Sequence, residues 1–362
     1  MSAQELKYVI GGDVSKSELE ICFKTLYEGQ VTKIKGSRKF PNTPKGYEAL
    51  QVWIEKRRKD QLIPVVVVLE ATGVYHENCA HFFHEIGYSV CIVVPSQSTY
   101  FLKSQGNKSK TDKIDASGIA QMGAERRLKI WTPPSKELMA IRNLNRHKNA
   151  LEKTKTQMNN RLHAHEYSSQ ANELIVKQLR DQIDYLNEQI EAITLAIDQA
   201  LETQSEFGQK VEKIANSING VGKASVASIA AEANGFELFH SIGQLTSFVG
   251  YDVIENQSGV RRGKTRISKK GNSHIRKTLF FPALNVVRLE VKTFSDLYER
   301  VFDRTKIKMK GYVAVQRKLL CLIYTLWKKD EAFDPDYQIT LQQEETLQLL
   351  PLPSSTLDRL EL

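Results

Sequence analysis

The sequence predicts an α/β domain followed by a long helical segment and a mainly α-helical domain. Residues 1–130 alternate short, strongly apolar runs with helix-like patterns. Residues 136–202 contain no glycine or proline, the two residues least compatible with a helix interior. Residues 206–330 show helical patterns separated by glycine-containing turns. A chain of 362 residues therefore accommodates two domains of ordinary size, with a helical connector that we place at 131–205.

The first domain reads as three strands followed by alternating helices and strands. The run IPVVVVLE is almost entirely β-branched, which is typical of a strand buried on both faces of a sheet. Thr43 and Pro44 favour a helix start, since threonine caps helices and proline fits their first position. We expect strands at 6–12, 18–25 and 31–40, a helix within 41–59, a strand at 63–70, a helix at 73–87, a strand at 88–94 that Pro95 stops, a basic loop, and a helix at 110–127.

The connector carries an apolar seam whose spacing alternates between four and three residues. This spacing is typical of coiled coils. It fits either a helical hairpin within one chain or a stalk between two chains, and the sequence leaves both open. The seam consists of Leu179, Ile183, Leu186, Ile190, Ile193 and Ile197.

In the second domain we expect a helix, a glycine hairpin and a helix within 214–232. A buried strand should precede Gly250, and two further helices should follow at 274–291 and near 311–329. The last segment, 331–362, is acidic and rich in leucine and glutamine.

Charge and cysteine content favour a protein that binds polyanions and argue against zinc-binding and disulfide-rich proteins. Lysine and arginine number 51 against 42 acids, a net charge of +9 that favours polyanionic partners. The segment 257–277 alone carries eight basic residues and no acid. Four scattered cysteines without a C-x-x-C pair argue against a zinc site or a disulfide framework. Without a signal peptide or an apolar run of about 18 residues, we expect a cytoplasmic protein that does not enter the membrane.

Four acids occupy positions that suit a metal-dependent catalytic site. Asp13 follows a buried strand, Glu70 ends another, and Asp112 and Asp115 share one face of a helix. An acid near a core is costly unless it is paired or binds a cation. Two Mg²⁺ (or Mn²⁺) ions that process a phosphodiester need carboxylates from several elements. Each acid could instead be a turn residue, and Asp112 could be a helix N-cap.

Three strings in this domain resemble one protein family. GGDVSKSELEI, LEATGVYH and KTDKIDA resemble the N-terminal domain of the IS110-family transposases. The resemblance covers about 6–130 and implies a RuvC-like, RNase H-type fold with a D…E…D-x-x-D site. Asp13, Glu70, Asp112 and Asp115 match that pattern in order, and Lys110, inside the third string, is expected to contact phosphate.

The string SINGVGKASVA resembles the hairpin of a helix–hairpin–helix element. Gly220 and Gly222 would let backbone N–H groups approach a phosphate at a helix N-terminus, and Lys223 would add charge. An ordinary turn between helices fits the same string. The resembling family usually has proline where this chain has Asn219.

Ser258 lies in the basic segment, and two interpretations of it are open. A serine nucleophile needs a base or a metal, and basic side chains can neutralise the transition state of a scissile phosphate. Alternatively, the segment only grips a nucleic-acid backbone. Residues of about 211–328 resemble the C-terminal domain of the same family, although the usual G-L-x-P is here Gly250-Tyr251-Asp252-Val253. That resemblance implies that Ser258 is the nucleophile. The basic residues expected to bind nucleic acid are Arg261, Arg262, Lys264, Arg266, Lys269, Lys270 and Arg276.

The resemblance also implies partners and a reaction. We expect a transposase that recombines DNA (element ends and target), guided by a structured non-coding RNA, in a prokaryotic cytoplasm near the nucleoid. It implies a homo-oligomer in which dimers assemble to a tetramer. Two rival hypotheses remain. One is a RuvC-like junction resolvase that uses the same acids with water, and the other is a non-catalytic scaffold that binds nucleic acid.

Overall fold

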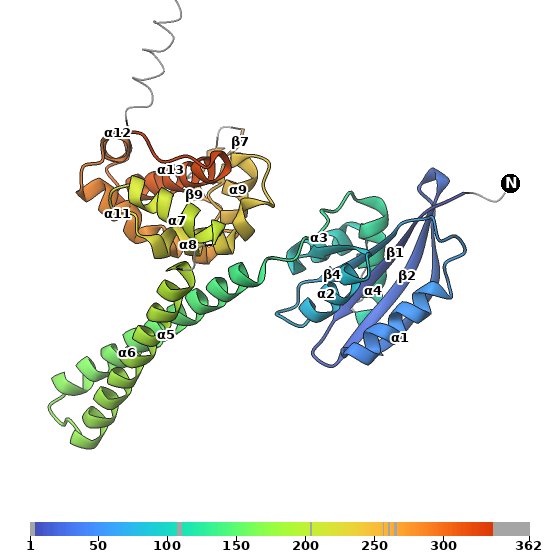
Figure 1. Ribbon diagram of the computed structural model, residues 1–362, viewed down its shortest axis with the longest axis horizontal. Helices are drawn as coiled ribbons and strands as arrows, with labels where there is room; N and C mark the ends of the chain where they lie inside the picture. Colours follow the sequence, from blue (N-terminus) through green and yellow to red (C-terminus); the bar gives the residue numbers. More distant parts are fainter. Residues whose placement is uncertain are drawn as a thin grey trace, which may run out of the picture. The chain divides into compact units, whose positions relative to one another are not determined.

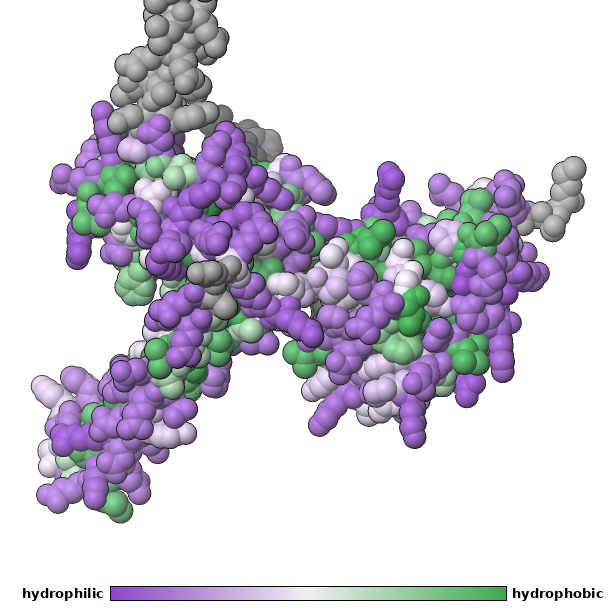
Figure 2. Space-filling view, in the orientation of Figure 1, coloured by the Kyte–Doolittle hydropathy of each residue, from purple (hydrophilic) through white to green (hydrophobic). Residues whose placement is uncertain are grey.

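The computed structural model describes residues 4–106, 111–202, 205–255, 257–259, 261–263 and 266–335, without the side chains of 257, 261 and 262. The chain divides into two compact units, Met1–Pro133 and Pro134–Leu362 (Figure 1). Hydrophilic residues dominate the visible surface of both, and apolar residues form only small patches (Figure 2). None of the described helices is long and apolar enough to cross a membrane.

The first unit is built on a five-stranded mixed sheet with the order β3-β2-β1-β4-β5. Strands β1 (Glu5–Val14), β2 (Glu18–Tyr27) and β3 (Thr32–Pro41) form an antiparallel meander. Strands β4 (Val65–Glu70) and β5 (Ser89–Val93) continue it in parallel with β1. A short 3₁₀ turn, η1 (Glu28–Gln30), joins β2 to β3. This topology confirms the expected RNase H-like fold.

Helices cover both faces of the sheet. On one face, α1 (Pro44–Glu55) and α2 (Glu77–Glu85) bury Leu50 and Phe83 against the sheet. On the other, α3 (Pro95–Ser104) and α4 (Asp112–Glu125) bury Phe101 and Ile119. The Thr43 hydroxyl accepts a hydrogen bond from the Gly46 N–H, so the expected cap of α1 is present.

Helix α3 corrects the expectation of a basic loop after β5. Pro95 ends the strand, but it is also the first residue of the helix. Proline suits that position because its fixed φ is helical and its missing N–H has no partner there. The helix buries Phe101, so tertiary packing stabilises a segment that looked irregular in sequence.

The second unit begins with a helical hairpin of α5 (Lys136–Tyr167) and α6 (Glu173–Glu202), which pack along each other (Figure 1). The side chain of Asn172 accepts hydrogen bonds from Leu174 N and Ile175 N and so starts α6. Every seam residue of α6 is buried or partly buried. The hairpin interpretation is therefore confirmed for one chain, whereas a coiled coil between chains stays a prediction.

The rest of this unit is a helical bundle around a single core, shared by α8 and α13 with their neighbours. The expected pair of helices around a glycine hairpin is present. The helices are α7 (Glu206–Ser217), α8 (Lys223–Glu232), α9 (Ile242–Val249), α10 (Ser273–Thr278), α11 (Phe280–Arg288), α12 (Lys292–Thr305) and α13 (Lys308–Lys329), with the 3₁₀ turn η2 (Asn234–Phe236).

Three expectations for this bundle were wrong. The segment before Gly250 is helix α9 rather than a strand, and Gly250 ends it with φ of 80°. The single helix expected at 274–291 is divided into α10 and α11, because Pro282 cannot donate the helical hydrogen bond to the carbonyl of Thr278. Helix α12 was not expected, whereas α13 extends the helix expected near 311–329. The acidic tail from 336 onward lies outside the described residues.

Candidate active site

Asp13 and Glu70 stand side by side where two parallel strands end. Strands β1 and β4 are in register, with Gly12 opposite Leu69, so the next residues of the two strands are neighbours. Val9 on β1 and Val68 on β4 belong to the core under α4. Side chains alternate along a strand, and Asp13 and Glu70 therefore point to the same face, the one that α4 covers.

Helix α4 brings the other two acids to this place. Thr111 is its N-cap, because the Thr111 hydroxyl accepts a hydrogen bond from Ile114 N at 3.3 Å. Asp112 is consequently the first helical residue and not the cap, which settles the alternative left open by the sequence. Asp112 and Asp115 both lie in the first turn, where the partial positive charge of the helix N-terminus stabilises anions.

Small residues allow α4 to lie directly on β1. A Cβ atom on Gly11 would stand 2.3 Å from Ala120 N and 2.5 Å from Ala116 O, both backbone atoms of α4. A Cβ on Gly123 would meet Val68 Cγ2 at 2.6 Å. The contact therefore requires glycine at these positions, and it sets the distance between the helix and the strand ends.

The electrostatics of Asp13 reflect this crowding. Burial, followed by the charges of Glu70, Asp112 and Asp115, raises the pKa of Asp13 from 3.8 to about 6. This shift agrees with the strand register and the start of α4, which place the four acids chosen from the sequence on one face at the same end of the sheet. We call Asp13, Glu70, Asp112 and Asp115 the carboxylate cluster.

Two neighbours of the carboxylate cluster were not identified from the sequence. The Ser98 hydroxyl donates a hydrogen bond of 2.6 Å to Glu70 Oε2. Glu20 pairs with Asp13 across β1 and β2 and is nearly buried. Ser98 was missed because α3 was taken for a loop, and Glu20 because it looks like one polar residue in an amphipathic strand.

In the conformation described, no three Asp, Glu, His or Cys side chains among the described residues already converge on one metal position. Carboxylates without a counter-charge repel one another, and a cation is what would draw them together. The chemistry of the donors suits Mg²⁺ or Mn²⁺, which prefer carboxylate oxygens.

Ser258 lies in a two-residue hairpin in the second unit. Strand β7 (Gln257–Ser258) pairs with β8 (Arg261–Arg262), and Gly259 turns the chain with φ of 56°. Ser258 itself is exposed to solvent. Lys110 and Lys264, together with the side chains of Arg261 and Arg262, lie outside what the structure describes.

Backbone contacts hold the segment that follows Ser258 against the helical bundle. Strands β6 (Val253–Ile254) and β9 (Arg266–Ile267) pair beneath the hairpin. Gly271 packs so closely that a Cβ would stand 2.3 Å from Phe248 O. Arg266, Lys269 and Lys270 remain exposed to solvent.

Arg276, also expected to bind nucleic acid, has structural contacts. Its guanidinium donates hydrogen bonds to Val249 O at 2.5 Å and Gly271 O at 3.3 Å. It therefore caps the end of α9 and holds the basic loop, and phosphate binding by Arg276 stays a prediction.

The glycine hairpin between α7 and α8 also has structural contacts. Gly220 adopts φ of 95° and packs against α11, where a Cβ would stand 3.2 Å from Val286 N. Gly222 faces open space in front of α8, and the Lys223 ammonium pairs with the Glu212 carboxylate. Of the three residues expected to bind phosphate here, Gly222 and Lys223 lie exposed at the N-terminus of α8, and phosphate binding by them stays a prediction.

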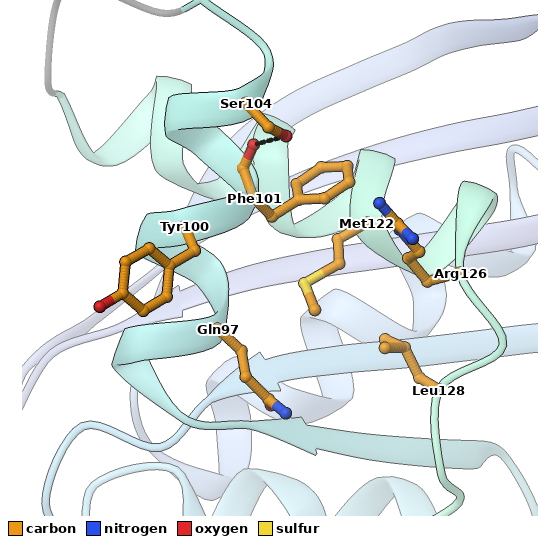
Figure 3. A pocket seen from close by; sticks show the side chains of 7 residues that line it. All are labelled: Gln97, Tyr100, Phe101, Ser104, Met122, Arg126 and Leu128. Carbon is orange, nitrogen blue, oxygen red and sulfur yellow. Dashed lines mark hydrogen bonds between the residues drawn. The ribbon is translucent and has the colours of Figure 1, made fainter. Parts of the chain in front are cut away.

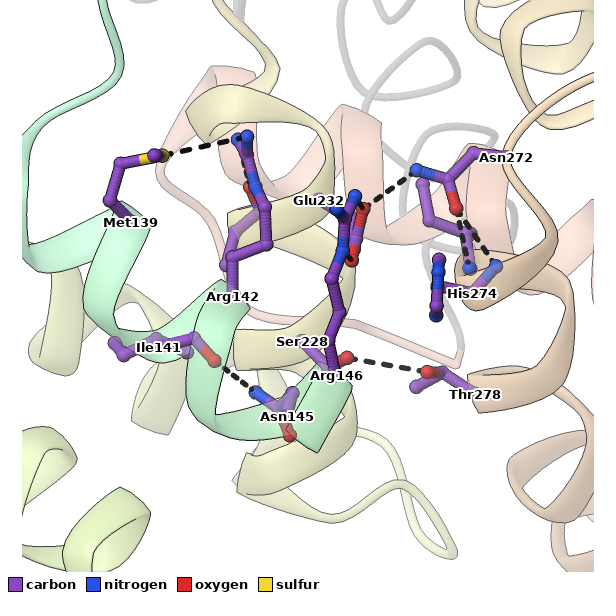
Figure 4. A network of polar contacts seen from close by, with 12 residues as sticks. Met139, Ile141, Arg142, Asn145, Arg146, Ser228, Glu232, Asn272, His274 and Thr278 are labelled. Carbon is purple, nitrogen blue, oxygen red and sulfur yellow. Dashed lines mark hydrogen bonds and ion pairs between the residues drawn. The ribbon is translucent and has the colours of Figure 1, made fainter. Parts of the chain in front are cut away.

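An ion pair with a buried carboxylate connects the hairpin of α5 and α6 to the bundle (Figure 4). Arg146 on α5 contacts both carboxylate oxygens of Glu232 on α8, at 2.7 and 2.8 Å. Asn272, which caps α10 through its side-chain oxygen, donates to Glu232 Oε2 at 2.8 Å. Burial raises the pKa of Glu232, but the hydrogen bonds from Arg146 and Asn272 outweigh it and hold the pKa below its ordinary value.

An RNase H-like sheet with acids at the ends of its central strands, joined to a basic helical domain, defines a class of proteins that process nucleic acids. Two family models match the chain. The model of the IS110 DEDD domain, described as "Transposase", matches residues 10–165, and "Transposase IS116/IS110/IS902 family" matches residues 212–299. The chain belongs to the IS110 family of transposases.

Curated relatives span both domains. The chain is 27% identical over 334 residues to the pilin gene-inverting protein of Moraxella lacunata. The aligned region covers 91% of this chain and 98% of the relative. The protein of the same name from Moraxella bovis matches to the same extent. A probable family 20 transposase of Pseudomonas aeruginosa is 21% identical over 256 residues, 63% of this chain and 73% of the relative.

Among solved structures, the chain is similar to RuvC of Thermus thermophilus. The match is 14% identical with a TM-score of 0.27 and covers 34% of this chain and 99% of RuvC. A second structure, of T. thermophilus RuvC in complex with a Holliday junction substrate, matches with 14% identity and a TM-score of 0.26, over 33% of this chain and 93% of that one.

Proposed function

We propose that the protein is a recombinase that cuts and exchanges DNA strands with the carboxylate cluster and with Ser258. The observation that carries the proposal is the placement of the four acids: Asp13 and Glu70 follow neighbouring positions of β1 and β4 on the face that α4 covers, and Asp112 and Asp115 lie in the first turn of α4. The raised pKa of Asp13 agrees with this placement. A cluster of this kind costs stability, and such a cost is typical of functional sites. DNA as the substrate follows from membership of a transposase family.

The four acids fit a divalent cation. Asp13, Glu70, Asp112 and Asp115 would hold Mg²⁺ or Mn²⁺, with Ser98 orienting Glu70 through its hydrogen bond. A cation there would neutralise the charge on a scissile phosphodiester and stabilise the leaving oxygen. Helix α4 contributes its N-terminal turn, which presents two of the acids from a rigid element.

Ser258 would act as the nucleophile. Its Oγ would attack the phosphorus of a DNA phosphodiester, so that the Oγ–P bond forms as the bond to one sugar oxygen breaks. The serine loses its proton and the departing sugar oxygen gains one, which leaves DNA on the protein through a phosphoserine. Ser258 is exposed, and the same segment exposes Arg266, Lys269 and Lys270, which supports this assignment.

Guidance by RNA and assembly of dimers into a tetramer belong to the same proposal, in a protein of the prokaryotic cytoplasm. The guide RNA follows from the resemblance to the IS110 family, and the net charge of +9 favours polyanionic partners in general. The exposed apolar residues Leu174 and Tyr185 lie eleven residues apart, and therefore on one face of α6, where a second chain could pack.

Formation of the circular element junction in cells tests the serine. The gene is supplied with its flanking DNA, and junctions are amplified for the wild type, for Ser258→Ala and for Ser273→Ala. Ser273 is an exposed serine of the same segment and serves as the matched control. We expect junctions with the wild type and Ser273→Ala only. Junctions with Ser258→Ala would instead favour a water-dependent, resolvase-like reaction.

A further inference from the structure

A hollow in the first unit is not used by the proposed reaction. It lies between α3 and α4, has a volume of about 470 Å³ and is open at the surface (Figure 3). Phe101 from α3, Met122 from α4 and Leu128 from the following chain supply its apolar surface. This volume falls within the roughly 300–1,000 Å³ of sites that hold small flat ligands.

Polar groups stand at the rim of this hollow. In Figure 3 the Met122 side chain lies between the guanidinium of Arg126 and the amide of Gln97. The Arg126 guanidinium also lies 5.9 Å from the centre of the Phe101 ring. Tyr100 adds an aromatic ring that is 65% exposed. An apolar surface with an aromatic ring, a guanidinium and an amide is the combination that binds nucleobases by stacking and edge hydrogen bonds.

The surroundings of the hollow are basic. Residues 95–106 and 121–130 contain four cationic side chains and a single carboxylate, Glu125. Lys103 and Arg127, which do not line the hollow, are both exposed beside it. Such a surface attracts the phosphates that flank a base.

The hollow and the carboxylate cluster lie along the same two helices, α3 and α4, with Met122 ten residues beyond Asp112 on α4, about 15 Å along the helix axis. Gln97 is the neighbour of Ser98, whose hydroxyl donates to Glu70. We expect a strand with a phosphate at the cluster to reach the hollow within a few nucleotides, because both are on the first unit and share α3 and α4. This continuity connects the hollow with the substrate of the proposed reaction.

From these observations we propose that the hollow between α3 and α4 binds one unpaired nucleobase of a single-stranded segment. The base would rest on Met122 and Leu128, and Arg126 and Gln97 would hold its edge or face. The inference rests on the proposed function and adds a binding site for an unpaired base to it. The strand can be DNA or RNA, because the hollow recognises the base and not the sugar.

Binding of charge-matched oligonucleotides to the full-length protein tests this site. The probes are a thymidine 20-mer and an abasic 20-mer with the same phosphates, each as DNA, together with a uridine 20-mer and an abasic RNA. The variants are Arg126→Gln and Tyr100→Ala, and Arg127→Gln is the control that removes the same charge outside the hollow. Thermal unfolding verifies that each variant is folded.

We expect the wild type to prefer the base-bearing strand by about fivefold or more, the range of one stacked base. Arg126→Gln and Tyr100→Ala should lose most of that preference, whereas Arg127→Gln should weaken base-bearing and abasic strands equally. If the variants lose the preference with the DNA probes, the hollow binds DNA, and if they lose it with the RNA probes, the hollow binds RNA. Equal weakening of both probes by Arg126→Gln would overturn the base site while nucleic-acid binding stands. Absence of binding to every probe would instead overturn the proposed function.

Discussion

Asp13 is a half-buried carboxylate that faces three others, and its pKa has a consequence for stability. The pKa is about 6 in the folded chain and about 3.8 in a flexible one. Between these values the folded state binds more protons than the unfolded state, so the free energy of unfolding falls as pH rises from about 4 to 6. Above about pH 6, ionised Asp13 lowers the free energy of unfolding by its full amount.

This cost predicts that Asp13→Asn stabilises the protein in EDTA at pH 7. We expect a gain on the order of 1 kcal/mol, because solvent screens part of the shift of this half-exposed group. Urea unfolding at pH 4.5 and 7 measures it, and the gain should be clearly smaller at the lower pH, where the folded Asp13 is mostly protonated. Mg²⁺ should stabilise the wild type but not the variant. A gain that is equal at both pH values would contradict the electrostatic origin.

At the scale of elements, the contact between α4 and β1 depends on Gly11. We predict that Gly11→Ala destabilises the fold by about 1–3 kcal/mol, because its Cβ would overlap backbone atoms of α4. The same shift would move Asp112 and Asp115 and lower junction formation. Gly243→Ala, in a helix with room for a Cβ, is the control and should be neutral or slightly stabilising. A neutral Gly11→Ala would refute this role of the contact.

The ion pair of Glu232 connects three helices, and its loss is a second prediction at this scale. Glu232→Gln removes one charge from a carboxylate whose side chain is only 2% exposed, and should cost about 2 kcal/mol or more in urea unfolding. Glu212→Gln, which breaks the exposed pair with Lys223, should change stability by less than about 1 kcal/mol. Similar losses of unfolding free energy in the two variants would show that the ion pair of Arg146 with Glu232 does not anchor α5.

At the scale of the whole molecule, the elements that could be predicted from the sequence are those with a long and uniform residue pattern. The β-branched composition of the valine run determines the type of β4, and the alternating spacing of the seam determines the type of α6. Helix α3 and the break between α10 and α11 depend on where single prolines fall, Pro95 starting one helix and Pro282 dividing another. Sequence patterns do not distinguish these two effects without the packing around them.

In the candidate site, too, some residues could be predicted from local sequence patterns and others only from tertiary packing. The four acids could be chosen from the sequence because each follows or ends a strand or opens a helix. Ser98 and the ion pair of Arg146 with Glu232 could not, because their partners are remote in sequence and only tertiary packing makes the contacts. Arg276 and Lys223 were chosen as phosphate ligands by composition, which did not reveal their contacts with Val249 O and Glu212; phosphate binding by both stays a prediction.

The measurement that tests the central claim most directly is junction formation in cells by Asp13→Asn, compared with Glu48→Gln. Both changes neutralise one acid, but Glu48 is exposed on α1, on the opposite face of the sheet. Protein amount and DNA binding are measured in parallel. We predict that Asp13→Asn binds DNA and forms no detectable junction, while Glu48→Gln recombines like the wild type. Wild-type recombination by Asp13→Asn would contradict catalysis by the carboxylate cluster.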